Sequence, residues 1–139
     1  MKTMLIAIMI LLTTTISAQD KYDQLMQKME IESQIKEFIN NYIDKLASES
    51  NGVSVSKWQT IKSKINYSTY LISIKSILQE HYPLNEIDNI FKANDMVASV
   101  NDTGKFIYKP KPIVREKMYQ LSRQYGKTLN EKIKKLIQE

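Results

Sequence analysis

The chain contains one histidine, His81, and two acidic residues, Glu86 and Asp88, follow it closely. Imidazole and carboxylate groups are common metal ligands and proton carriers, so this spacing raises a metal site or acid–base catalysis as hypotheses. A structural zinc site usually needs four nitrogen or sulfur ligands, which one histidine in a chain without cysteine cannot supply. We therefore interpret the two acids as first-turn residues of a helix, where negative charge favours the helix dipole. The sequence predicts no metal ligand and no cofactor.

No nucleophile motif accompanies His81. The sequence has no G-x-S-x-G segment, no glycine-rich phosphate loop and no pair of histidines at helical spacing. A small hydrolase or a small-molecule-binding protein with a site near His81 stays open as the alternative function, because a histidine can act as a base. Nothing in the sequence singles out a catalytic residue, so it favours a protein that is not an enzyme.

The basic residues near the C-terminus form the second candidate site. Between Pro112 and Ile137, apolar residues recur at almost every third or fourth position, which is typical of one long amphipathic helix. Pro112 suits the first turn of such a helix. The face opposite the apolar stripe carries the possible interaction surface: Arg115, Lys117, Arg123, Lys127, Lys132, Lys134 and Lys135.

Charge is distributed unevenly along the chain, whose formal net charge is +5. Residues from Lys105 to the C-terminus carry a net charge of +7, whereas residues 19–104 carry −3. In one interpretation, an acidic first helix lies near the basic last helix and complements it. In the other, the basic face meets an acidic envelope component or an anionic membrane surface.

The first residues have the pattern of a signal peptide. Lys2 precedes an apolar run from Met4 to Leu12, and small and polar residues follow this run up to Ala18. A membrane-spanning helix needs roughly 20 apolar residues, so the short run favours cleavage over a retained anchor. We expect cleavage after Ala18, which would remove residues 1–18, leave a domain of residues 19–139 and lower the formal charge to +4. The expected location is the periplasm or the cell exterior, where nucleic acid is not an expected partner.

The elements that position these residues are expected to be helices. Apolar residues at helical spacing predict four helices: residues 20–47, a short segment around Trp58, residues 67–81, and a helix that begins at residue 84 and whose last residue the sequence does not define. Phe38 is expected on the inner side of the first helix. Ser54 or Ser56 is expected to cap the short helix. Every long element has a helical period and the chain suits one domain, so we predict an all-α, small single-domain helical bundle without disulfides.

Particular residues mark the breaks between these helices. The apolar stripe of the first helix drifts between Met29 and Ile35, which predicts a bend or break there. Tyr82 is expected to be extended, because the following proline disfavours helical backbone. Gly126 lies inside the last helix, where glycine costs roughly 1 kcal/mol relative to alanine. We therefore expect a neighbouring element to approach closely at Gly126.

Landmarks in the second half of the chain follow a recognisable order: Tyr82, Pro83, Glu86, Ile87, Phe91, Gly104, Lys105, Phe106, Pro112, Tyr125 and Gly126. An amphipathic helix ends in an aromatic residue, the next helix opens on an acidic turn, and a glycine precedes a proline-led final helix with an aromatic-glycine pair. This order resembles the small exported bacterial proteins of the family named domain of unknown function two thousand and fifty-nine. The resemblance covers about Trp58 to Ile137 and implies an exported helical protein. It implies no activity and no catalytic residue.

These features predict an exported helical protein of unknown function that works through contacts, as a non-enzymatic interaction module of the bacterial envelope. The basic last helix is the expected contact surface. The identity of the partner and the oligomeric state are open at this point.

Overall fold

The computed structural model describes residues 21–100 and 106–139, with side chains described up to residue 96 in the first range. Its helices are α2 (Ile31–Glu49), α3 (Val55–Lys64), α4 (Ser68–His81), α5 (Leu84–Val100) and α6 (Pro112–Gln138), and residues 21–28 are also helical. No strand occurs in these two ranges, and the predicted all-α class is confirmed. The expected signal peptide, residues 1–18, and the landmarks Gly104 and Lys105 lie outside the described residues.

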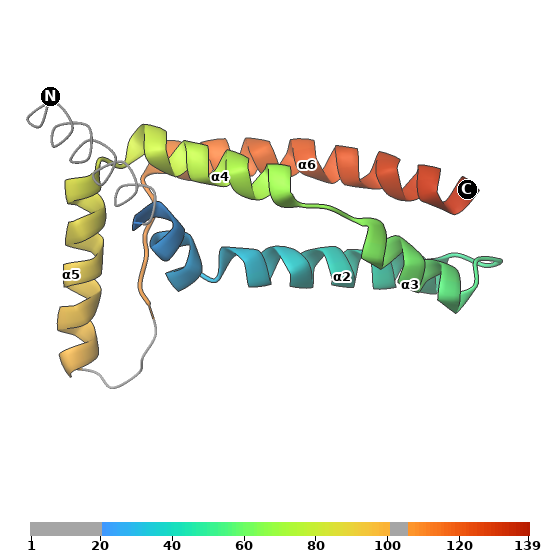
Figure 1. The fold of residues 1–139 in the computed structure, drawn as a ribbon, viewed down its shortest axis with the longest axis horizontal. Coiled ribbons are helices and arrows are strands. Elements are labelled where there is room, and N and C mark those ends of the chain that lie inside the picture. The colour runs from blue at the N-terminus through green and yellow to red at the C-terminus, as the bar shows by residue number, and fades with distance from the viewer. Residues whose placement is uncertain (1–20, 101–105) are drawn as a thin grey trace, which may run out of the picture.

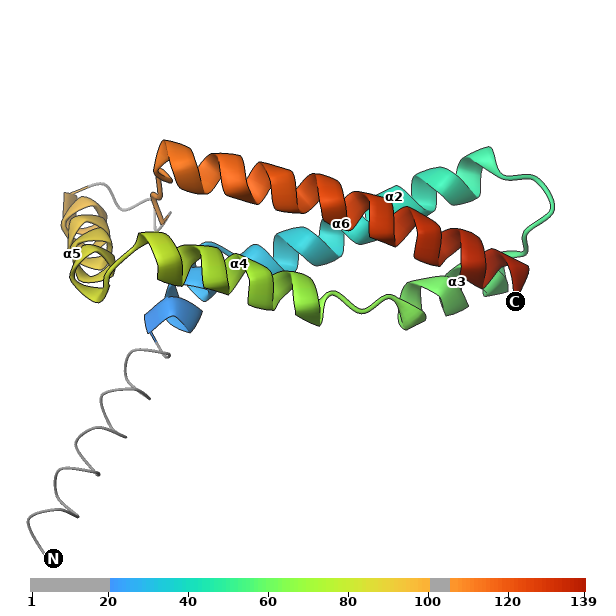
Figure 2. The same ribbon diagram turned by 90° about the horizontal axis from the view of Figure 1, so that it is seen from above.

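Most of the helices follow one long axis (Figure 1). α6 lies beside α4 and runs in the opposite direction, while α2 and α3 lie across from this pair. α5 stands across the bundle, at the end where α4 finishes and α6 begins (Figures 1 and 2). The described residues therefore form a small helical bundle closed at one end by a transverse helix.

The core is apolar and draws on every described helix. Trp58 is buried, as expected for a core anchor, and no charged residue among those described is buried. Burying one leucine or isoleucine side chain contributes about 1.5–3 kcal/mol, so packing is the main source of stability. The largest fully buried side chains are Leu25, Ile43, Ile61, Leu78, Ile87, Val114 and Ile133.

The predicted irregularity between Met29 and Ile35 is a full break at Glu30. Glu30 has a φ of 54°, in the left-handed region, and it separates the helical residues 21–28 from α2. The side-chain amide of Gln34 donates to the carbonyl oxygen of Met29 at 2.9 Å, so it satisfies an acceptor that lies at the break. The break directs residues 21–28 away from the axis of α2 (Figure 1).

The other predicted boundaries are also present. The Ser54 hydroxyl oxygen accepts a hydrogen bond from the backbone N–H of Lys57 at 3.2 Å, which caps α3. Gly52 occupies the preceding turn with a φ of 97°, a conformation that favours glycine. Tyr82 is extended, with φ −123° and ψ 104°. The helix expected from residue 84, with its last residue undefined, is α5, which ends at Val100.

Two sequence expectations are wrong. Helical spacing places Phe38 on the inner side of the first helix, but its side chain is 57% exposed. Since the break at Glu30 resets the helix, the buried stripe of α2 follows Ile35, Ile39 and Ile43, and Phe38 lies beside it. The glycine at position 126 predicts a close approach, but a Cβ atom added to Gly126 would meet no atom of the described residues within 4 Å, so the added atom would enter open space.

Candidate functional site

The basic residues of α6 lie mostly at the surface. The exposed ones are Arg115, Arg123, Lys127, Lys132, Lys134 and Lys135. Lys117 is partly buried, and its Nζ lies 2.8 Å from Oε1 of Glu80 on α4. This hydrogen bond lowers the pKa of Glu80, which favours its charged carboxylate form. Lys117 therefore joins α6 to α4, whereas the other six are turned towards solvent.

None of the six exposed bases of α6 forms an ion pair with any residue that the structure describes. Lysines on other helices do pair with the acidic N-terminal part. Lys62 of α3 lies 2.6 Å from Asp44, and Lys75 of α4 lies 2.5 Å from Asp23. These acids of the first helices are therefore paired with α3 and α4, and they do not neutralise the exposed charges of α6.

The six exposed bases do not share one face of α6. An α-helix turns by about 100° per residue, so Arg123, Lys127 and Lys134 fall within about 40° of one another. We call these three residues the outer strip. Lys135 is about 100° and Lys132 about 200° round the helix from Lys134, so they lie on other sides. The guanidinium group of Arg123 also lies 5.9 Å from the ring centre of Tyr119, within the range of a cation–π contact.

His81 does not form a catalytic arrangement with any described group. Its Nε2 atom is buried without a hydrogen-bond partner, and it lies 3.5 Å from Oε1 of Glu80. No described hydroxyl group hydrogen-bonds to the imidazole ring, and His81 lines none of the three hollows described below. The described residues therefore place no nucleophile against the His81 ring.

The two acids that follow His81 are used elsewhere. Glu86 lies 2.6 Å from Nζ of Lys111, and Asp88 lies 2.7 Å from Nζ of Lys21. Both ion pairs tie α5 to other segments, so these acids have a structural role. Within the described ranges, no group of three or more histidine, cysteine or acidic side chains is placed to hold a metal ion.

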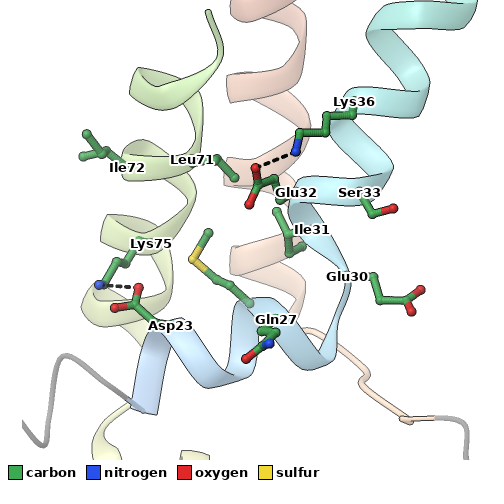
Figure 3. A pocket seen from close by; sticks show the side chains of 11 residues that line it. Asp23, Gln27, Glu30, Ile31, Glu32, Ser33, Lys36, Leu71, Ile72 and Lys75 are labelled. Atoms are coloured by element: carbon green, nitrogen blue, oxygen red, sulfur yellow. Dashed lines mark hydrogen bonds and ion pairs between the residues drawn. The ribbon is translucent and has the colours of Figure 1, made fainter.

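The largest of these three hollows, of about 710 Å³, lies where residues 21–28, α2 and α4 meet (Figure 3). The two lysines of its lining are paired with acids of the same lining. Lys75 contacts Asp23, and Lys36 lies 2.9 Å from Glu32. The hydrogen bond with Lys36 lowers the pKa of Glu32 and raises that of Lys36, which keeps both groups charged. This hollow therefore presents no unpaired cation to a ligand. A second hollow, of about 500 Å³, lies between the break at Glu30 and the segment before α6.

A smaller hollow of about 320 Å³ lies between α2, α4 and α6, and we call it the aromatic hollow. The rings of Tyr70 and Tyr125 stack in it with their centres 4.4 Å apart. Burial raises the pKa of both phenols, so they are neutral at physiological pH. The phenol oxygen of Tyr125 is buried without a hydrogen-bond partner among the described residues. The lining residues are Ile35, Phe38, Tyr70, Ser122, Arg123 and Tyr125.

Comparisons with protein-family models, with curated proteins and with solved structures found no match to this chain. The resemblance to the family of exported proteins therefore stays a prediction. Within residues 21–100 and 106–139, no helix combines the length and apolar character needed to cross a membrane.

Proposed function

We propose that this chain is an exported, non-enzymatic interaction module of the bacterial envelope, and that it binds an anionic partner through the exposed bases of α6. The observation that carries the proposal is the absence of ion pairs at these six bases within the described structure, although lysines of α3 and α4 are paired. Unpaired cations on a rigid helix attract an anionic partner at long range.

The rest of the described surface supports a contact function over catalysis. His81 has no aligned nucleophile, and the acids near it are held in ion pairs. The outer strip, in contrast, presents three cations from a helix that the core holds in place through Val114, Leu129 and Ile133. A positively charged surface of this kind binds an acidic envelope component or anionic lipid headgroups, and exported proteins meet both.

The test is sedimentation with anionic phosphatidylglycerol vesicles, together with binding to immobilised polyglutamate, at low and at physiological salt. We expect binding to at least one probe at low salt and weaker binding at physiological salt, where charges more than about 8 Å apart are largely screened. A lysine near an anionic surface contributes on the order of 1 kcal/mol. The double variant Lys127→Glu with Lys134→Glu should therefore bind at least about tenfold more weakly.

A matched control is the double variant Lys28→Glu with Lys92→Glu. Both lysines are exposed, lie outside α6 and form no ion pair with a described residue, and the change in net charge is the same. We expect this control to keep most of the binding. Equal loss in both double variants would indicate a response to net charge alone, and no binding to either probe would overturn the proposal.

A further inference from the structure

We infer that the aromatic hollow receives one large apolar side chain of an acidic protein segment. This inference rests on the proposed function and names the class of partner. The hollow is at the lower end of the volumes of about 300–1,000 Å³ that are typical of ligand pockets, so it suits one side chain better than a whole cofactor.

The lining of the hollow has the composition of a protein contact site. Phe38 is 57% exposed at its edge, with its ring centre 6.3 Å from that of Tyr42, and Tyr70 and Tyr125 form its stacked wall. Aromatic residues and arginine are enriched where proteins bind one another, because large side chains fill pockets from which water is excluded. An apolar side chain in the hollow would cover Phe38.

The charges around the hollow select an acidic segment. Arg123 lines it, and Lys127 lies one helical turn further along the outer strip. Neither residue forms an ion pair with a described acid. On the α2 side, the residues one turn away from Phe38, Gln34 and Asn41, carry no charge, and the nearest acid in the sequence is Glu37. Arg123 is the one charged residue of the lining, so carboxylates that flank an apolar anchor would meet Arg123 and, one turn further, Lys127.

A protein segment fits this arrangement better than a membrane surface does. Proteins that insert into lipid present several apolar side chains along one exposed helix face. The exposed face of α6 near the outer strip is mostly polar, with Glu116 and Gln120. The exposed large apolar side chains of α6 are Ile113 and Tyr119, and they lie about 120° apart around the helix, so they do not form one apolar face. The aromatic hollow, in contrast, gathers apolar and aromatic side chains from three helices in one concave site, which suits an anchor residue in a peptide.

The experiment uses the purified protein and three synthetic peptides in isothermal titration calorimetry at low salt. The first peptide has one central phenylalanine among aspartate and glutamate, the second has alanine in place of phenylalanine, and the third has asparagine and glutamine in place of the acids. We expect the first peptide to bind at least about tenfold more tightly than either of the others, because both the anchor and the carboxylates contribute.

Two protein variants locate the anchor. Phe38→Ala removes an exposed side chain, so the fold should survive, and it should abolish the preference for phenylalanine over alanine in the acidic peptides. The matched control is Ile72→Ala, because Ile72 is 65% exposed on α4 and lines the largest hollow instead. This control should keep the preference. Loss of the preference in Ile72→Ala but not in Phe38→Ala would overturn the inference.

The outcomes separate this inference from the proposed function. Equal binding of the phenylalanine and alanine peptides, weakened by Lys127→Glu with Lys134→Glu, would overturn the aromatic hollow as the site and leave the anionic contact intact. Binding to phosphatidylglycerol vesicles without binding to any acidic peptide would also overturn the inference, in favour of lipid. A failure of peptides, polyglutamate and vesicles alike would overturn both.

Discussion

The backbone N–H of Lys111 donates a hydrogen bond to the phenol oxygen of Tyr82 at 2.7 Å. The Tyr82 carbonyl oxygen accepts a second bond, from the hydroxyl of Tyr22, at 2.6 Å. Nζ of Lys111 also donates to the carbonyl oxygen of His81 at 2.9 Å and lies 4.8 Å from the ring centre of Tyr82. Tyr82, between α4 and α5, thus fastens both the helical residues 21–28 and the start of α6, which carries the candidate surface.

Tyr82→Phe should destabilise the protein measurably. The change leaves the Lys111 N–H without its acceptor in a partly buried position, and an unsatisfied buried group costs about 1–3 kcal/mol. Denaturant unfolding followed by circular dichroism measures the loss. Tyr119→Phe is the control, because the Tyr119 side chain is 57% exposed, and its effect should stay within about 0.5 kcal/mol. Equal stabilities for the two variants would show that the Tyr82 hydroxyl does not support the fold.

Gly126→Ala should stabilise the protein by up to about 1 kcal/mol, because alanine favours a helix interior and the added methyl group meets open space. Gly52→Ala should have the opposite effect, since Gly52 has a φ of 97° that an L-residue rarely adopts. Melting temperatures of the two variants and the wild type provide the test. A melting temperature below that of the wild type for Gly126→Ala would contradict this prediction and would indicate that another element packs closely against Gly126.

Helical spacing predicts the elements of this fold well where packing follows local sequence. The break near Glu30, the Ser54 cap and the start of α6 at Pro112 all carry local signals, namely a drift of the apolar stripe, a capping hydroxyl and a proline in the first turn. Spacing misplaces Phe38 because it defines the inner side over one continuous helix. The break at Glu30 gives α2 its own stripe, and spacing alone does not say which of two adjacent apolar residues is covered.

The candidate site is only partly predictable from the sequence. The basic residues of α6 are evident from spacing. That six of them form no ion pair with a described residue becomes visible only in the fold, where acids pair with other lysines, such as Asp88 with Lys21 and Asp23 with Lys75. Sequence reasoning misses the aromatic hollow, because Phe38, Tyr70 and Tyr125 come from three helices and converge only in the folded chain. Phe38 lines this hollow and is exposed, but in the sequence its spacing is that of an ordinary core residue.

Export should remove residues 1–18. The charged start, the short apolar run and the terminal alanine fit a processing site better than an anchor. Intact-mass measurement of the protein recovered from the envelope or the medium should give a chain that begins at Gln19. A mass that includes Met1 to Ala18 would contradict the predicted cleavage.

Stability should fall in alkaline solution through three partly buried tyrosines. Burial raises the pKa of Tyr70, Tyr108 and Tyr125 above the usual value of 10.0, because the phenolate form is disfavoured away from water. The unfolded chain therefore loses these protons first. The contribution of these protonated phenols to the free energy of unfolding is fully present below about pH 10, and it is lost as the pH rises through their pKa values in the folded protein. Urea unfolding between neutral and strongly alkaline pH should show this decline.

Tyr125→Phe should make the alkaline decline less steep. The Tyr125 phenol oxygen has no hydrogen-bond partner among the described residues, so the variant removes a titrating group without breaking a bond. Tyr119→Phe is the control and should keep the wild-type slope, because the Tyr119 side chain is 57% exposed. The slope of the unfolding free energy against pH is proportional to the difference in the number of protons bound by the unfolded and the folded chain. The slopes of the two variants therefore show how much each phenol contributes to that difference. Identical slopes would show that Tyr125 titrates as freely in the folded protein as in the unfolded chain.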